Sequence, residues 1–362
     1  MRRLRAAGGV STMTIAGRTI GAGHPAYIIA EMSANHSHDF GHALRIVEAA
    51  AAAGADAIKL QTYTADTLTI PCSNEYFQIR GTQWSGRTLY DLYQEAYTPW
   101  EWHQPLKEAA DRLGLHFFST PFDRTAVDFL DDLQVPAFKV ASFELIDVPL
   151  LREIARRGKP MIASTGMASL GEIAEAVDVI RAAGGTSLAL LKCTSGYPAR
   201  PEEMHLRTIP DLAAKFDVPV GLSDHTLGTE VSVAAVSLGA SIIEKHLTLS
   251  RADGGPDASF SLEPQEFAAM VTAVRTAERA LGTVHYGVSP EEAASRVFRR
   301  SLFVVKDVRA GEPFTADNVR SIRPGHGLHP RHLDEVLTMR AARDIACGTP
   351  LDWPLVERDT TD

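Results

Sequence analysis

The sequence predicts an α/β fold: a TIM (β/α)8 barrel followed by a small C-terminal β domain. Eight short apolar runs alternate with amphipathic stretches between Tyr27 and His246. Several of these stretches end in a glycine just before the next run, the usual helix C-cap residue (Gly54, Gly114, Gly158 and Gly239). After Gly282 this rhythm stops, and a short motif then occurs twice in the remaining chain.

The eight apolar runs are the expected barrel strands: 27–31, 55–61, 115–120, 137–142, 160–164, 188–193, 218–223 and 241–246. Buried parallel strands read as continuous apolar runs because helices cover them, and eight βα units match a TIM barrel. An open doubly wound sheet is the alternative, but it normally has a glycine-rich turn after its first strand. Here residues 33–36 read SANH, which favours the barrel.

The chain divides into four expected segments. Residues 1–13 contain three arginines with no apolar stretch after them, so we expect a disordered tail, with Met13 as an alternative start. Residues 14–282 would form the barrel and 283–297 a polar linker. Residues 298–362 would form the second domain, which at about 65 residues is small enough to depend on contact with a barrel, its own or a partner's.

The repeated motif of the second domain predicts a pseudo-symmetric β fold. KDVRAGEPF and RDIACGTPL share an aspartate, a glycine and a proline, and Asp344 lies 37 positions after Asp307.

Composition excludes several classes of function. Thirty-six Lys and Arg against 45 Asp and Glu give a net charge of -9, so no overall positive field favours nucleic acid or an anionic membrane. No stretch is long enough to span a bilayer. The three cysteines are odd in number and far apart, which is typical of a reducing compartment. We therefore expect a cytoplasmic protein that binds neither nucleic acid nor membrane.

A long segment after the second strand, residues 63–102, is rich in Tyr and Trp. Loops of this length are commonly lids or binding loops. The alternative is a hydrophobic cluster that packs on the barrel, and both interpretations can hold together.

Polar residues gather at the carboxyl ends of the expected strands, which is the active-site face of a TIM barrel. They are Glu31, Lys59, Gln61, Thr120, Lys139, Ser142, Ser164, Lys192, Ser223, His225, Glu244 and His246. Strand ends are also polar wherever they meet solvent. Lysines inside apolar runs favour a functional interpretation, because lysine is rarely buried without a partner.

Two kinds of binding site are expected on this face. His225 and His246 end neighbouring strands and could hold a divalent cation, manganese or a similar metal, completed by water and substrate oxygens. Lys59 and Lys139, with the hydroxyls of Thr120, Ser142, Ser164, Ser195 and Ser223, suit a phosphorylated carboxylate. The alternatives are hydrogen-bonded histidines and hydroxyls that satisfy strand-end backbone groups.

A series of motifs resembles the sialic acid synthase family across nearly the whole chain from Thr14: AEMSANH, GADAIKLQTY, FFSTPFD, FKVASFE, STGMASLGEI, LLKCTSGYP, GLSDHTLG, EKHLTLSRADGGPD and RSIRPGHGLHP. Residues 72–103 and 246–264 further resemble the branch of that family that makes pseudaminic acid.

The resemblance implies a TIM barrel joined to an antifreeze-like (SAF) β-clip domain in a domain-swapped homodimer, where the small domain caps the partner's barrel. It also implies a metal-dependent reaction, with Mn²⁺, Mg²⁺ or Co²⁺ as cofactor. Phosphoenolpyruvate would condense with the open-chain aldehyde of 2,4-diacetamido-2,4,6-trideoxy-β-L-altropyranose and water, giving pseudaminic acid and phosphate.

The resemblance assigns roles residue by residue. His225 and His246 match metal ligands that activate the sugar aldehyde, and Glu31 matches the carboxylate that handles the attacking water. Phosphoenolpyruvate and other substrate contacts fall to Lys59, Gln61, Thr120, Lys139, Ser142, Ser164 and Ser223, with Ser195 standing where sialic acid synthases carry asparagine. Glu144, Tyr197 and Asp257 match acceptor-sugar positions, and Arg323 matches an arginine supplied by the partner.

Three alternatives stay open from the sequence. The acceptor could be a related N-acetylhexosamine, as in a sialic or legionaminic acid synthase. One of Lys59, Lys139, Lys192 or Lys245 could instead form a Schiff base in a metal-independent aldolase. The chain could also be a non-catalytic sugar- or peptidoglycan-binding protein, although this leaves the metal and phosphate residues without a role.

Overall fold

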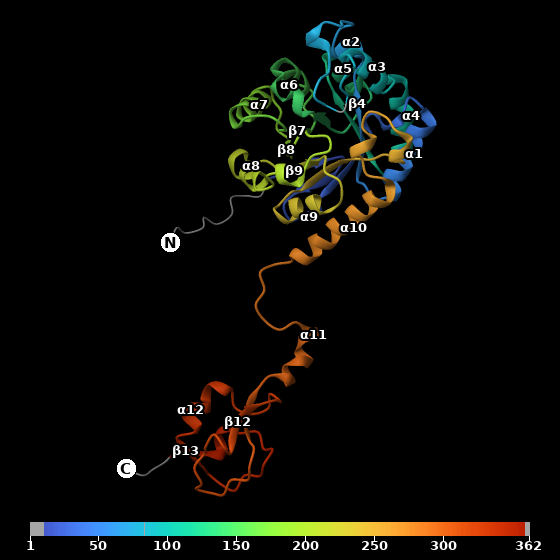
Figure 1. Cartoon of the computed structure of the whole chain (residues 1–362). Coiled ribbons are helices and arrows are strands. Elements are labelled where there is room, and N and C mark those ends of the chain that lie inside the picture. The colour runs from blue at the N-terminus through green and yellow to red at the C-terminus, as the bar shows by residue number, and fades with distance from the viewer. Residues whose placement is uncertain (1–10, 83, 359–362) are drawn as a thin grey trace. The chain divides into compact units, whose positions relative to one another are not determined.

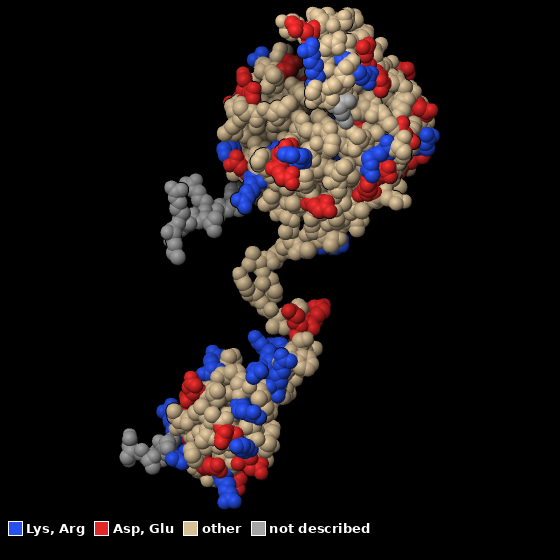
Figure 2. All heavy atoms as spheres, viewed as in Figure 1, with Lys and Arg blue, Asp and Glu red and all other residues tan. Residues whose placement is uncertain are grey.

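The chain forms two compact units, Met1–Gly282 and Thr283–Asp362, in a computed structural model that describes residues 11–82 and 84–358 (Figure 1). The boundary coincides with the point where the alternating pattern of the sequence stops. Among the described residues no helix is both long and apolar enough to cross a bilayer. Lys and Arg are interspersed with Asp and Glu on the face of the barrel unit shown in Figure 2.

The first unit is a closed barrel of eight parallel strands in the order β10-β3-β4-β5-β6-β7-β8-β9, which confirms the predicted fold (Figure 1). The strands are β3 (Tyr27–Glu31), β4 (Ala57–Thr62), β5 (His116–Pro121), β6 (Phe138–Val140), β7 (Met161–Ser164), β8 (Leu188–Cys193), β9 (Val220–Asp224) and β10 (Ile242–His246). Strand β6 is shorter than expected because residues from Ser142 turn into a 3-10 helix, η4 (Ser142–Ile146).

Helices surround the strands and bury an apolar face against them. They are α1 (Phe40–Ala52), α4 (His103–Arg112), α5 (Arg124–Asp132), α6 (Val148–Ala155), α7 (Leu170–Ala182), α8 (Thr208–Phe216), α9 (Glu230–Ser237) and α10 (Pro264–Leu281). Several begin with side-chain caps, such as the Ser169–Glu172 capping box of α7. Gly54 and Gly114 adopt φ of +84° and +77° after α1 and α4, the left-handed conformation for which glycine was expected there.

The N-terminal prediction is wrong at its boundary. Thr12–Ile15 form β1, which pairs with β2 (Arg18–Gly21) in an antiparallel hairpin. Met13 is only 4% exposed because it alternates with outward-facing threonines and packs into the barrel core. Residues 12 and 13 therefore belong to the barrel unit, and residues 1–10 lie outside the described part of the chain.

The segment between β4 and α4 contains α2 (Ala65–Leu68), η2 (Glu75–Phe77), α3 (Leu89–Ala96) and η3 (Trp100–Trp102). Part of it packs as a hydrophobic cluster: the Tyr63 ring lies 5.7 Å from Tyr93 and 5.2 Å from Phe122, and Trp100 lies 4.8 Å from Phe129. These centroid distances fit edge-on and tilted aromatic packing. The packing interpretation therefore holds for this part of the segment.

The second unit contains β11 (Ser301–Val304), β12 (Val319–Ile322), α12 (Leu333–Val336), β13 (Met339–Ala341) and β14 (Val356–Arg358) around its own apolar core. The expected linker includes a short helix, α11 (Pro290–Ala293), and most of η8 (Ala294–Phe298).

The two copies of the repeated motif bind each other symmetrically. Val308 and Ile345 exchange backbone hydrogen bonds of 2.9 and 2.8 Å. The Asp344 carboxylate accepts from the Ala310 amide at 2.7 Å, and the Asp307 carboxylate accepts from the Cys347 amide at the same distance. These partners are related by the same shift of 37 positions, so the predicted pseudo-symmetry is confirmed.

Candidate active site

A buried cluster of charged side chains lies at the carboxyl ends of β3, β4 and β10. Lys59 forms an ion pair with Glu31, donates to Thr120 Oγ1 at 3.2 Å, and lies 3.8 Å from Glu244 Oε1. Strand register places these groups together, since Glu31 pairs with Lys59 on one side and with His246 on the other. Lys59 is only 4% exposed, so its charge depends on these partners.

Lys139 brings a second cation to the same cluster. Its Nζ donates to Ser164 Oγ at 2.6 Å and to the Val140 carbonyl at 2.9 Å, and lies 3.7 Å from Glu244 Oε1. Ser223 donates to Glu244 Oε1 at 3.2 Å. Glu244 therefore lies between two lysines from different strands.

The sequence interpretation missed the importance of Glu244, which it had noted only as a polar strand end. A signal was available: Glu244 and His246 are two residues apart in a strand, so both project from the same face. Lys59 and Lys139, which the sequence assigned to a phosphorylated carboxylate, are paired with carboxylates of the protein itself.

The pKa values in this cluster differ because burial and charge act in opposite directions. Burial raises the pKa of Glu31, in spite of the opposing effect of Lys59. Burial also acts to raise the pKa of Glu244, but Lys139 and Lys59 outweigh it and lower that pKa. Burial lowers the pKa of Lys139. Glu31 is thus the carboxyl that takes up a proton more readily, which suits a general base.

His225 and His246 face each other beside this cluster, with ring centroids 5.3 Å apart. His225 Nδ1 lies 3.0 Å from the Thr194 carbonyl oxygen, and donation to it leaves the Nε2 lone pair available. Burial lowers the pKa of His246 well below its usual value, so its imidazole is neutral. His246 Nδ1 is buried and has no hydrogen-bond partner among the described residues.

These features fit the expected divalent metal. The neutral imidazole of His246 has an available lone pair, as a metal ligand requires. Burial acts to lower the pKa of His225, but the hydrogen bonds to Cys193 and to the Thr194 carbonyl outweigh it and raise that pKa. In residues 11–82 and 84–358 no group of three or more His, Cys, Asp and Glu is arranged to hold an ion. The chain would therefore supply two ligands, and water and substrate the rest.

The acceptor-sugar candidates line the other side of the histidine pair. The Tyr197 ring lies 4.6 Å from His225 and 5.0 Å from Phe260, and Phe260 lies 4.9 Å from His246. Asp257 accepts hydrogen bonds from Ser33 Oγ and from the Ala34 amide, and burial raises its pKa. Gln61 also donates to Ser33 Oγ, at 2.9 Å. Ser33 and Phe260 were not predicted, since neither residue type signals a site by itself.

The hydroxyls of Ser142 and Ser195 converge on Gly166. The Gly166 amide donates to Ser142 Oγ at 3.0 Å, and a Cβ at Gly166 would lie 2.4 Å from Ser195 Oγ and 2.7 Å from Ser142 Oγ. Only glycine leaves room for both hydroxyls. Glu144, in η4, has its pKa raised to about 7 by burial.

The comparisons with known proteins match this architecture. Residues 46–286 match the NeuB family, and residues 299–357 match the SAF domain. The chain belongs to the NeuB family.

Named relatives cover almost the whole chain. A pseudaminic acid synthase of Campylobacter jejuni serotype O:2 is 46% identical over 90% of this chain and 95% of its own length. The pseudaminic acid synthase of Helicobacter pylori is 41% identical over 92% of this chain and 98% of its own length. The structure of an N-acetylneuraminic acid synthetase from Leptospira borgpetersenii aligns with a TM-score of 0.71 at 33% identity, covering 79% of this chain and 95% of that protein.

Two lysines proposed as Schiff-base candidates lie apart from the charged cluster of this NeuB family member. Lys245 bonds to Asp224 Oδ2 at 2.7 Å and to the Thr226 carbonyl at 2.6 Å, and both ion-paired side chains are fully buried. Lys192 donates to the Cys193 carbonyl at 2.7 Å and to Thr194 Oγ1 at 3.1 Å. A lysine whose Nζ is held in a buried ion pair, as in Lys245, is poorly placed to act as a nucleophile.

Arg323 is the one predicted site residue outside the barrel. It follows β12 in the C-terminal unit.

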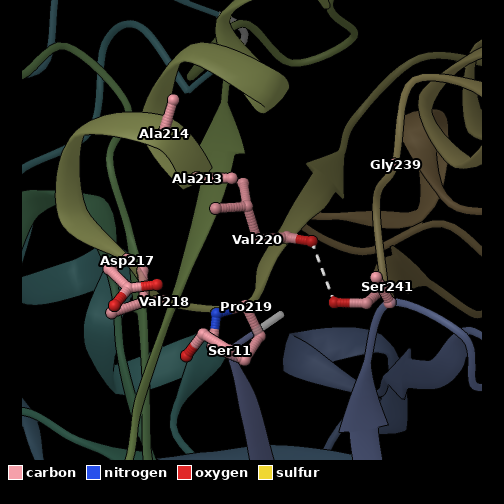
Figure 3. A pocket seen from close by; sticks show the side chains of 10 residues that line it. Ser11, Ala213, Ala214, Asp217, Val218, Pro219, Val220, Gly239 and Ser241 are labelled. Carbon is pink, nitrogen blue, oxygen red and sulfur yellow. Dashed lines mark hydrogen bonds between the residues drawn. The ribbon is translucent and has the colours of Figure 1, made fainter. Parts of the chain in front are cut away.

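A cavity of about 470 Å³ opens at the opposite end of the NeuB barrel, beside the first residues of β9 and β10 (Figure 3). Its lining includes Val220 and Ser241, whose hydroxyl donates to the Val220 carbonyl at 3.1 Å. Among its described lining residues only Asp217 is ionisable. This cavity therefore offers little chemistry, whereas the buried charged cluster lies at the carboxyl ends of the strands, where TIM barrels carry their active sites.

Proposed function

We propose that this chain condenses phosphoenolpyruvate with 2,4-diacetamido-2,4,6-trideoxy-altrose and water to give pseudaminic acid and phosphate. The observation that carries the proposal is the adjacency of the Lys59–Lys139 cluster and the His225–His246 pair, which can place an anion beside a polarised aldehyde. The pseudaminic acid synthases that match almost end to end support the acceptor.

Phosphoenolpyruvate would bind at the buried lysines. Lys59 and Lys139 supply charge, while Thr120 and Ser164, which already accept from them, can turn their hydroxyls toward the ligand. Glu31 and Glu244 balance the lysines before the substrate arrives. The raised pKa of Glu31 suits this carboxylate to accept a proton later in the reaction.

The condensation needs an electrophilic aldehyde and a base for water. A divalent cation, Mn²⁺, Mg²⁺ or Co²⁺, held by His225 and His246 would act as a Lewis acid on the aldehyde oxygen. The C2–C3 π electrons of phosphoenolpyruvate form the bond from C3 to C1 of the sugar, which leaves C2 electron-poor, and the aldehyde oxygen becomes a hydroxyl with the proton that water gives up to Glu31. Glu31 accepts a proton from the water that adds to C2, and the resulting hemiketal phosphate loses phosphate.

The acceptor is oriented by Asp257, Glu144 and Tyr197 on the opposite side of the histidine pair. Asp257 is held by Ser33 and Ala34, so its carboxylate has a fixed direction toward sugar hydroxyls or amides. Arg323 of a second copy completes this part of the site, as a donor to an acetamido oxygen.

The same proposal includes a domain-swapped homodimer in the cytoplasm. Phe143, Ile146, Met167 and Leu170, all more than half exposed, follow β6 and β7 at the catalytic end of the barrel. Because η4 packs beside β7 and α7, they form an exposed apolar surface of the kind that marks interfaces. Co-expression of His246→Ala and Arg323→Ala chains should recover activity that neither variant has alone, since a swapped heterodimer retains one complete site. Inactive heterodimers would contradict the swap.

The experiment that tests the function is mass spectrometry of the product from phosphoenolpyruvate, Mn²⁺ and a panel of acceptors. We expect pseudaminic acid and phosphate from the trideoxy sugar, with loss of product on chelation. Higher kcat/KM with N-acetylmannosamine or with a legionaminic acid precursor would assign another branch. A borohydride-trapped lysine adduct with chelator-resistant turnover would instead indicate an aldolase, and no phosphate release from any acceptor would indicate a binding protein.

A further inference from the structure

Trp84 connects the long segment after β4 to the candidate active site. Its indole Nε1 donates a 3.0 Å hydrogen bond to the carbonyl of Pro256, which is 172 positions away in the chain. Its ring centroid lies 5.7 Å from that of Tyr197. Trp84 is thus held by two contacts, one of them to Tyr197, which packs on His225, whereas Tyr76 in the same segment is 81% exposed.

The partner of Trp84 is itself fixed. Pro256 directly precedes Asp257, whose carboxylate is bound by Ser33 and Ala34 after β3. The peptide at Pro256–Asp257 is therefore tied on one side to the barrel and on the other to Trp84. This arrangement holds the indole in one place, as is required of a residue that discriminates between substrates.

Trp84, Tyr197 and Phe260 form a continuous aromatic series beside the histidines. Tyr197 packs on His225, Phe260 packs on both Tyr197 and His246, and Trp84 lies one ring farther out, beyond Tyr197. Burial raises the pKa of Tyr197, so its ring carries no charge. An uncharged aromatic surface of this kind favours a methyl group over a hydroxyl.

We propose that Trp84 determines specificity by receiving the C6 methyl group of the acceptor sugar. The inference rests on the proposed function, because it takes the aldehyde carbon to lie at His225 and His246. With C1 anchored there, the far end of a six-carbon chain extends past Tyr197 toward Trp84. If C6 carried a hydroxyl, that hydroxyl would lose hydrogen bonds to water when it packs against these aromatic rings, and it would gain no new ones.

The test uses two acceptors that differ only at C6, the trideoxy sugar and its 6-hydroxyl analogue, with both acetamido groups kept. One methyl contact in an apolar pocket is worth roughly 10- to 100-fold in kcat/KM. Trp84→Ala should lower kcat/KM for the trideoxy sugar by about that factor and for the analogue by less than about threefold. KM for phosphoenolpyruvate should not change. Trp84→Phe, which keeps a ring but loses the donor to Pro256, should retain most of the preference.

Tyr76→Ala is the matched control, since it removes an exposed aromatic ring from the same segment, and it should leave both acceptors unaffected. If Trp84→Ala lowers kcat/KM equally for both acceptors, the residue is merely structural. If the variant keeps full activity and an unchanged ratio of the two kcat/KM values, the methyl group binds elsewhere. Either result overturns the inference while leaving the proposed function intact. A wild-type enzyme that condenses neither acceptor would overturn the proposed function, and the inference with it.

Discussion

Glu244 and Lys245 are neighbours in β10, yet their side chains belong to two different kinds of buried charge. Lys245 pairs with Asp224, whose carboxylate also accepts from the Thr226 amide, the Thr226 hydroxyl and Ser232, at 2.7 to 2.9 Å. Glu244 lies nearly 4 Å from each of two lysines, and its Oε2 is buried with no hydrogen-bond partner among the described residues.

The difference separates structure from function. A buried ion pair with every donor and acceptor satisfied fixes the backbone and gains nothing from a ligand. A buried cluster with unpaired atoms and competing charges is costly in the empty protein, and clusters of this kind are typical of functional sites. The same strand therefore anchors the barrel on one face and, on the other, carries the cluster for which substrate binding is proposed.

Breaking the satisfied pair should have the largest effect on stability. Lys245→Met leaves the Asp224 carboxylate buried without its counter-ion, which should cost about 3–5 kcal/mol of unfolding free energy, measured by urea denaturation. The matched control is Lys215→Met, which removes an exposed ion pair with Asp211 and should cost less than about 1 kcal/mol. Partial recovery in Lys245→Met with Asp224→Asn would locate the loss in the unpaired carboxylate. A stable single variant would mean that the pair is dispensable.

Removing a lysine from the unsatisfied cluster should act on turnover instead. Lys139→Met leaves Glu244 with Lys59 and Ser223, so the unfolding free energy should change little, while kcat/KM falls by about 10²- to 10³-fold. The readout is phosphate release at varied phosphoenolpyruvate concentration. Lys159→Met, which breaks an ion pair with Asp131 outside the cluster, serves as the control and should keep its activity. If Lys139→Met were destabilised and fully active, the comparison would be reversed.

The strand order and the active-site face could be predicted from the sequence because apolar runs, terminal glycines and polar strand ends are local signals. Which charged side chains pair with each other could not be predicted from the sequence. Whether Lys59 or Lys245 faces the barrel interior depends on the alternation of each strand, and the partners Glu31 and Asp224 come from other strands. Likewise, the Trp84–Pro256 contact joins segments that no local pattern relates.

Glu144 is an intermediate case, a carboxyl without a close cation. Its effect on the free energy of unfolding should be smaller and should depend on pH. Burial raises its pKa from the usual 4.5 to about 7, so the folded protein binds this proton more tightly than the unfolded chain. Its contribution to stability is full below pH 4.5, decreases as pH rises toward 7, and is then constant.

Glu144→Gln cannot titrate, so the free energy of unfolding of wild type minus that of the variant should fall by up to about 3 kcal/mol across this range. Urea denaturation at several pH values gives this difference. A difference that does not vary with pH would show that Glu144 keeps an ordinary pKa.

The most direct test of the account is pulsed EPR of Mn²⁺ bound to ¹⁵N-histidine-labelled enzyme with phosphoenolpyruvate. We expect coupling from the nitrogens of His225 and His246, lost stepwise in His225→Ala and His246→Ala, together with coupling from the phosphorus of the bound substrate. Manganese that binds without histidine coupling, or that shows no coupling to phosphorus, would contradict the claim that the cation and the enolpyruvyl anion share one site.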